Sequence, residues 1–407
     1  MKRVVITGIG IYSCLGTNID QVRDALFQGK SGIIMDEVRK QMGFRSGLTG
    51  SLERPQLKGI LHRRERVRLA EEGEYAYLAT VDALEGAGMD KDFLADGEVG
   101  ILYGNDSSAK AVIDSADLMR EKQDTMLLGS ASIFKSMNST VTMNLATIFK
   151  LKGVSFTISG ACASGSHSIG MAYLLIRSGM QEQIICGGAQ EINAEAMASF
   201  DGLSAFSTRE SAPHEASRPF DAGRDGLIPS GGGATLILES LESAKKRGAK
   251  ILGEVIGYGF SSNGDHISVP NAAGPARALE LCMKDSGLDL KAVDYINAHA
   301  TSTPVGDMKE AESIDRVFGD VKPVVSSTKS MTGHECWMAG ASEAVYSLIM
   351  MENDFIAPNI NLETPGKEAE NLNLTSKTLE QKLNVVISNS FGFGGTNASL
   401  ALCRFSE

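Results

Sequence analysis

The sequence is poor in the residues that build disulfide frameworks, metal sites and membrane spans. Its 407 residues include six cysteines and six histidines, and no two cysteines form a CxxC pair. A disulfide framework or a zinc site is therefore not expected, and scattered thiols are typical of a reducing cytosol. The uncharged stretch at residues 136–149 is too short and too polar to cross a bilayer. An apolar strand begins directly after the first three residues, so we expect no signal peptide and a cytoplasmic location.

Positive charge is in the minority as well. The chain has 39 lysines and arginines against 50 aspartates and glutamates, a formal net charge of −11. This excess argues against binding of nucleic acid or of an anionic membrane. The exception is a basic cluster, which is either a solvated helix start or a docking patch for a small acidic partner. Its members are Lys58, Arg63, Arg64, Arg66 and Arg68.

Strand-like and helix-like segments alternate along the whole chain. The strands expected before residue 250 are 3–7, 98–103, 154–159, 183–187 and 231–239. The pattern then restarts, with strands expected at 251–258, 293–297, 324–326, 385–388 and 398–403. Such alternation predicts parallel-type sheets covered by helices. We therefore predict a duplicated α/β architecture with an N-terminal half at 1–249 and a C-terminal half at 250–407.

A dinucleotide-binding motif is not present after the first strand. Gly8 and Gly10 begin as such a motif does, but Ser13 stands where the third glycine is needed. No acidic residue closes a second strand about 20 residues later. We therefore expect no dinucleotide cofactor there.

Cys162 stands where the expected strand at 154–159 turns into a helix that begins with small residues. At such an elbow, backbone N–H groups and the helix dipole favour a thiolate and lower the cysteine pKa. The alternative is a small buried cysteine without a chemical role, because free cysteine is among the most buried residue types. Motifs elsewhere in the chain must decide between the two.

Two histidines also follow expected strands, at the edge where sites form in α/β folds. His299 lies in Asn297-Ala-His-Ala-Thr-Ser-Thr-Pro-Val-Gly-Asp307, where Thr301 and Thr303 offer hydroxyls to a ligand amide. His334 ends the run that starts at Ser326. A single histidine is often only a core residue, but two at neighbouring strand ends favour a site.

The same edge carries a predicted ion pair and a glycine-rich turn. Lys329 and Glu343 both lie in apolar surroundings, and buried ions are costly unless paired, so we expect them to pair behind His334. The turn Ser388-Asn-Ser-Phe-Gly-Phe-Gly-Gly-Thr-Asn397 contains Phe391 and Phe393. It is either a tight β-turn or a loop of backbone N–H donors with an aromatic gate.

Taken together, these motifs resemble the β-ketoacyl-acyl-carrier-protein synthases, and most of all the elongating synthases I and II of fatty-acid synthesis. The resemblance runs from the opening Val-Val-Ile-Thr-Gly-Ile-Gly10 to the last strand. It implies a thiolase-like duplicated fold, a five-layered αβαβα body and a homodimer. It also implies chemistry without a metal and without an organic cofactor on this chain.

The resemblance implies a role for each motif. Cys162 takes the acyl chain from the phosphopantetheine thiol of acyl carrier protein, and His299 and His334 assist loss of CO2 from malonyl and stabilise the enolate. The backbone N–H groups of Cys162 and Phe393 form the oxyanion hole. The other implied assignments are Lys329 and Glu343 as the supporting pair, Phe391 and Phe393 as gate, Thr301 and Thr303 for pantetheine, Phe200, Leu227, Trp337 and Phe134 (across a dimer) for the acyl pocket, and the basic cluster for carrier docking.

The expected reaction is decarboxylative condensation that extends an acyl chain by two carbons. A thiolase would need a second cysteine near the glycine-rich turn, and none is there. Three departures from the family pattern leave the substrate open, namely Trp337 and Ala300 at usual glycines and Leu227 at a common phenylalanine. The alternatives are a ketosynthase of a dedicated polyene or polyketide carrier pathway, a non-catalytic partner like a chain-length factor, and a heterodimer with a paralogue.

Overall fold

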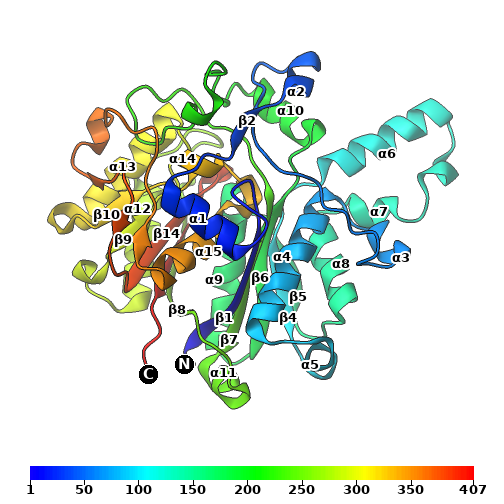
Figure 1. Cartoon of the computed structure of the whole chain (residues 1–407), viewed down its shortest axis with the longest axis horizontal. Coiled ribbons are helices and arrows are strands. Elements are labelled where there is room, and N and C mark those ends of the chain that lie inside the picture. Colours follow the sequence, from blue (N-terminus) through cyan, green and yellow to red (C-terminus); the bar gives the residue numbers. More distant parts are fainter.

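A mixed sheet of eleven strands forms the centre of the molecule in the computed structural model, which describes residues 1–407 except for the side chain of Asp96 (Figure 1). From one edge to the other, the strand order is β12-β10-β9-β14-β15-β8-β1-β7-β6-β4-β5. The strands are β1 (Val4–Tyr12), β4 (Gly100–Gly104), β5 (Ser155–Ile158), β6 (Gln183–Gln190), β7 (Gly232–Ser240), β8 (Gly253–Ser262), β9 (Tyr295–Asn297), β10 (Val324–Ser326), β12 (Asn373–Leu374), β14 (Val385–Phe391) and β15 (Thr396–Cys403).

The sheet contains one five-strand pattern twice. In the first copy the strands stand in the order β1-β7-β6-β4-β5, and in the second in the order β8-β15-β14-β9-β10. In each copy the first two pairings are antiparallel and the last two are parallel. β1 and β8 pair antiparallel and join the two copies. The topology confirms the predicted duplicated α/β fold.

Helices form three layers around the two copies of the pattern, which gives the expected αβαβα order. Helices α9 (Ser164–Arg177) and α15 (Ala339–Glu352) lie side by side in the middle layer (Figure 1). Helices α4 (Glu71–Ala87) and α8 (Thr140–Phe149) cover the first copy. Helix α12 (Ala273–Ser286), with α13 (Pro304–Phe318) beside it, covers the second. Nearly all of α15 is buried, as expected for a helix enclosed on every side.

Shorter elements complete the fold. Helices α6 (Ala109–Lys122) and α7 (Ser132–Lys135) form an arm that projects from the body (Figure 1). No helix among the described residues is long and apolar enough to span a bilayer. The further elements are α1 (Ile19–Gln28), β2 (Ile33–Met35), α2 (Glu37–Gln41), β3 (Leu48–Gly50), α3 (Arg63–Arg66), α5 (Lys91–Asp96), α6 (Ala109–Lys122), α7 (Ser132–Lys135), α10 (Ala194–Gly202), α11 (Leu241–Arg247), α14 (Lys329–Thr332), β11 (Phe355–Ile356) and β13 (Leu379–Glu380).

Candidate active site

The four strand-end motifs meet around one cavity of about 430 Å³. Strand β5 leads to Cys162, β9 to His299, β10 through α14 to His334, and β14 to the glycine-rich turn. Because β9, β10 and β14 are parallel neighbours, their carboxyl ends open at the same edge of the sheet. Cys162, both histidines, Phe391 and Phe393 all line the cavity. The sequence therefore predicted the residues that the fold brings together.

Cys162 lies in a 3-10 turn, Ala161–Ala163, immediately before α9. The turn is tight, since Ala161 has a φ of +46°, in the left-handed region that L-residues rarely adopt. Two hydrogen bonds hold it, from Ala161 N–H to Asp106 Oδ2 at 2.8 Å and from Gly160 N–H to Ser164 Oγ at 2.8 Å. Asp106 is a residue that sequence reasoning missed.

The Cys162 thiol is 5% exposed, and burial raises its pKa to about 12. The positive charge of Lys329 and the backbone N–H groups of Phe393 and Cys162 act in the opposite direction. The prediction that the elbow lowers the pKa is therefore wrong for the free thiol. Desolvation of the thiolate outweighs the nearby N–H groups. The two groups predicted as oxyanion donors are nevertheless those that approach the sulfur.

His299 and His334 lie edge to face, with ring centroids 5.3 Å apart. Both are buried, and burial together with the charge of Lys329 holds the pKa of each imidazole well below its usual range. Each Nδ1 is buried without a hydrogen-bond partner among the described residues. The two rings are neutral at physiological pH, so each carries one N–H and no positive charge.

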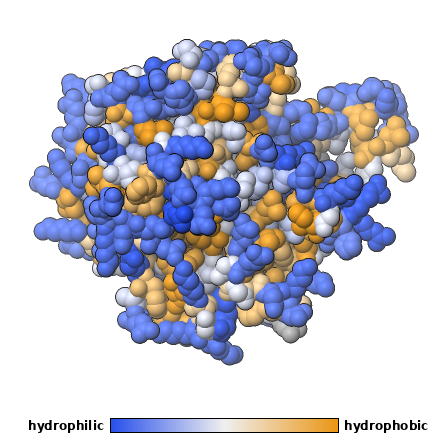
Figure 2. Space-filling model, viewed as in Figure 1, coloured by the Kyte–Doolittle hydropathy of each residue, from blue (hydrophilic) through white to orange (hydrophobic). Residues whose placement is uncertain are grey.

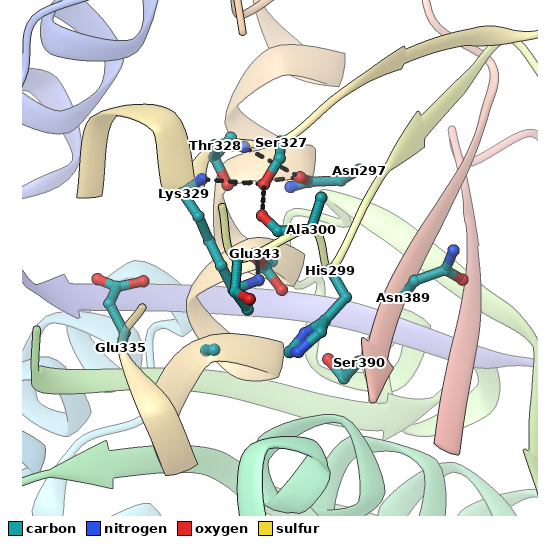
Figure 3. Close-up of polar contacts among 12 residues, drawn as sticks. Asn297, His299, Ala300, Ser327, Thr328, Lys329, Glu335, Glu343, Asn389 and Ser390 are labelled. Carbon is teal, nitrogen blue, oxygen red and sulfur yellow. Dashed lines mark hydrogen bonds and ion pairs between the residues drawn. The ribbon is translucent and has the colours of Figure 1, made fainter. Parts of the chain in front are cut away.

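Lys329 and Glu343 form an ion pair behind the histidines (Figure 3). Both side chains are 1% exposed. Burial raises the pKa of Glu343 to about 7, and the charge of Lys329 opposes that shift. The positive charge of Lys329 also lowers the pKa of Cys162 and of both imidazoles, because it disfavours the protonated forms. The buried positive charge of Lys329 thus acts on Cys162, His299 and His334.

Sequence reasoning missed a carboxylate that holds the His299 loop. Glu310 accepts hydrogen bonds from the N–H groups of His299 at 2.9 Å and Ala300 at 2.6 Å, and from Asn389 Nδ2 at 3.1 Å. Burial raises its pKa to about 7. Its position gave no local signal, because Glu310 lies in the second turn of α13, beyond the first turn where a carboxylate is favoured by the helix dipole.

Of the six residues predicted to bind pantetheine and acyl groups, four line the cavity and two do not. Thr301 and Thr303 line the cavity, with their hydroxyl oxygens 3.1 Å apart. Phe200 and Leu227 line it too. Trp337 does not, because it packs behind Phe200 with ring centroids 5.9 Å apart. Phe134 lies in α7 of the arm, 40% exposed, and the single chain does not bring it to the cavity.

The basic cluster lies on and around α3, away from the lining of the cavity. Lys58, Arg63 and Arg64 are exposed, whereas Arg66 and Arg68 are half-buried. No member forms an ion pair with any carboxylate whose side chain the structure describes. Its charge is therefore free to meet another molecule.

A cysteine, two neutral imidazoles and a buried Lys–Glu pair at strand ends of a duplicated five-layered fold define a thiolase-like condensing enzyme. Residues 1–244 match the family model described as Beta-ketoacyl synthase, N-terminal domain, and residues 252–363 match Beta-ketoacyl synthase, C-terminal domain. The chain is 42% identical to 3-oxoacyl-[acyl-carrier-protein] synthase 1 of Haemophilus influenzae, over all of both proteins.

Solved structures agree with this match. A β-ketoacyl synthase from Burkholderia phymatum STM815 superposes with a TM-score of 0.94 at 36% identity, over all of both chains. The ketosynthase of a type II polyketide synthase, solved in complex with its acyl-carrier protein, superposes with a TM-score of 0.90 at 26% identity, covering 99% of this chain and all of the other. The chain belongs to the β-ketoacyl synthase family and is an acyltransferase of the condensing type.

Proposed function

We propose that this enzyme is a 3-oxoacyl-[acyl-carrier-protein] synthase of fatty-acid elongation, with Cys162 as nucleophile. The observation that carries the proposal is the convergence of Cys162, His299 and His334 on one cavity. Full-length similarity to a synthase 1 supports the substrate class. A non-catalytic partner subunit would need neither the thiol nor both imidazoles, and this chain has all three lining the cavity.

In the first half-reaction, the Cys162 sulfur attacks the carbonyl carbon of the acyl-carrier thioester. A new thioester forms on Cys162, the bond to the carrier's sulfur breaks, and the thiol proton leaves with the carrier's thiol. The negative oxygen of the tetrahedral intermediate is stabilised by the backbone N–H groups of Cys162 and Phe393, which already approach the sulfur. The charge of Lys329 favours the thiolate that this step requires.

In the second half-reaction, the carbon–carbon bond of malonyl-carrier breaks and releases CO2. The electron pair passes to the thioester oxygen as an enolate, which accepts N–H bonds from His299 and His334. Neutral imidazoles suit this task because they donate hydrogen bonds without protonating the enolate carbon. That carbon then attacks the acyl carbonyl on Cys162, the carbon–sulfur bond breaks, and Cys162 leaves as a thiolate that takes up a proton from water.

Thr301 and Thr303 hold the pantetheine arm of the carrier, since both hydroxyls line the cavity. The exposed, unpaired charges of the basic cluster favour docking of an acidic carrier protein.

The protein acts in the cytoplasm. Its halves are residues 1–249 and 250–407.

A second copy of the chain covers the open edge of the sheet. Strand β5 is the terminal strand there, and Phe156 on it is 50% exposed. An exposed edge with apolar side chains is a place where another chain adds. Figure 2 shows apolar side chains gathered on the neighbouring arm. In this part of the chain Met126 is 84% and Ile133 is 60% exposed. Such a homodimer would carry Phe134 toward the partner's acyl pocket, and native mass spectrometry of the purified protein distinguishes it from a monomer.

The decisive experiment traps the acyl group. The His334→Ala variant is incubated with acyl-carrier and malonyl-carrier thioesters, and the mass of the Cys162 peptide is measured. We expect a stable acyl adduct on Cys162 and little elongated product. Efficient elongation by a Cys162→Ser variant, or a lack of adduct on the unmodified enzyme with every acyl donor, would contradict the proposal.

A further inference from the structure

The fold builds the nucleophile turn twice. The turn Ala161–Ala163 leads into α9, and the turn Cys336–Met338 leads into α15; each helix has 14 residues. The first residues of the two turns, Ala161 and Cys336, share the same left-handed φ of +46°. Cys162 and Trp337 therefore occupy equivalent positions in the two copies of the pattern. We call these the Cys162 turn and the Trp337 turn.

The two turns pack against each other at the point where α9 and α15 meet. The contact is close and reciprocal. A Cβ at Gly165 would lie 2.7 Å from Ala341 N, and a Cβ at Gly340 would lie 2.6 Å from Ser166 N. Only glycine permits such an approach of the two helices. As a result Cys162, Cys336 and Trp337 belong to one packed cluster, together with Phe200.

Contacts from several elements fix Trp337. Its Nε1–H donates to Ser107 Oγ at 3.1 Å, and the residue is 8% exposed. Its backbone presses on β6, where a Cβ at Gly188 would lie 2.8 Å from Trp337 O. The preceding Glu335 is buried and accepts hydrogen bonds from Ser342 and Tyr346 of α15. The backbone of Trp337 is therefore fixed, and its indole N–H has a hydrogen-bond partner.

On the side of the Trp337 turn, the cavity ends at Phe200, which packs on the indole. Its lining includes Cys162 and Phe200 but neither Trp337 nor Cys336. Phe200 stands in front of Trp337 and also stacks on Phe206 and Phe393, at 6.3 and 6.2 Å between centroids. An acyl chain on Cys162 thus meets packed rings on the side of the Trp337 turn. The remaining space is the cavity that also admits the pantetheine arm.

We propose that Trp337 is a specificity-determining residue that restricts the enzyme to compact acyl groups of a few carbons and excludes long saturated chains. The inference rests on the proposed function, because it concerns the acyl group that Cys162 carries. A long chain would have to displace an indole that buries about 150–250 Å² and leave its N–H unpaired. A short chain fits beside Phe200 without moving it.

The test compares acyl transfer to Cys162 from butanoyl-carrier and dodecanoyl-carrier thioesters by intact-protein mass spectrometry. The unmodified enzyme should prefer butanoyl by about 10-fold or more, as expected for discrimination by pocket size. Trp337→Ala should raise dodecanoyl transfer about 10-fold while butanoyl transfer stays within about 3-fold. Ser107→Ala, which frees the indole N–H, should give a smaller change in the same direction.

Phe206→Leu is the matched control, because Phe206 also stacks on Phe200 but lies outside the cluster of Cys162 and Trp337. It should leave the preference unchanged. If the alanine variant does not fold, Trp337→Phe removes less of the side chain. Its preference for butanoyl over dodecanoyl should lie between those of the unmodified enzyme and Trp337→Ala. Equal transfer of both acyl groups by the unmodified enzyme, or an unchanged preference in both Trp337 variants, would overturn the proposal. Absence of any acyl adduct on the unmodified enzyme would instead refute the proposed function.

Discussion

The Cys162 turn and the Trp337 turn begin with the same left-handed φ but have opposite surroundings. The Cys162 turn opens on the cavity, where both histidines and the N–H of Phe393 reach it. The Trp337 turn is closed by Phe200, Ser107 and α15. Duplication thus supplies the geometry of a nucleophile elbow twice, and the side chains decide which copy reacts. Both imidazoles and the Lys–Glu pair come from the copy that lacks Cys162, so the site is assembled from both copies.

Removing the nucleophile tests this asymmetry most strongly. Cys162→Ser should lower condensation by about 10³-fold or more, because Cys336, the thiol of the Trp337 turn, does not line the cavity and burial raises its pKa well above its usual range. The formation of 3-oxoacyl-carrier product measures it. Cys282→Ala is the control, since Cys282 is buried in α12 outside the cavity, and it should keep its activity. Comparable losses of condensation activity in Cys162→Ser and Cys282→Ala would contradict the assignment of the reaction to the Cys162 turn.

The next largest effect is expected at the histidines. His299→Ala and His334→Ala should each lower malonyl decarboxylation by about 10²- to 10³-fold while acyl transfer to Cys162 persists. Glutamine also donates an N–H, so His334→Gln should recover part of the rate. Release of CO2 from malonyl-carrier is the measurement. If alanine and glutamine variants behave alike, the hydrogen-bonding role assigned to the neutral ring is wrong.

Breaking the buried ion pair should cost stability. Lys329→Met leaves Glu343 without its partner in a fully buried place, which is expected to lower the free energy of unfolding by about 3–5 kcal/mol. Lys329→Met with Glu343→Leu should cost less, because neither charge remains. Urea denaturation of both variants gives the comparison. A double variant less stable than the single one would contradict this account.

Charge reversal of the exposed basic cluster should have a moderate effect confined to the carrier. Arg63→Glu with Arg64→Glu is expected to raise the KM for acyl-carrier by about 10-fold at low salt, and less at high salt, since the interaction is screened. Acyl transfer from acyl-CoA should be unaffected. Lys245→Glu with Lys246→Glu makes the same change of charge on α11 and serves as control. An equal rise in KM for both donors would exclude a docking role.

The smallest effect is expected from pH. The pKa of His299 and of His334 is lowered, so both rings stay neutral where an ordinary histidine, with a pKa near 6.5, takes up a proton. Decarboxylation should therefore change by less than about 2-fold between pH 7.5 and pH 6, whereas a histidine of ordinary pKa would lose most of its neutral form. A rate that falls with an apparent pKa near 6.5, also in Glu310→Gln and Glu343→Gln variants that lack the carboxyls of pKa about 7, would show that burial does not hold these rings neutral.

Short-range patterns in the sequence determined the elements that support the site. Asn18 caps α1 by accepting from Gln21 N–H, as its position predicts. The strand-end motifs were predictable because the carboxyl ends of parallel strands open at one edge. The repeated alternation of strands and helices was enough to predict the duplicated fold. These features depend on residues that are close in the chain or on rules that hold for every α/β sheet.

Tertiary structure decided what depends on residues distant in the chain. The pKa of Cys162 is raised because the whole surroundings desolvate the sulfur, which a local elbow motif does not reveal. Glu310 holds the His299 loop only because α13 folds back beneath it. Trp337 was visible in the sequence as an unusual residue, but only the packing of α9 on α15 places it in one cluster with Cys162. Motifs fix which groups can react, and long-range packing fixes how much space and charge surround them.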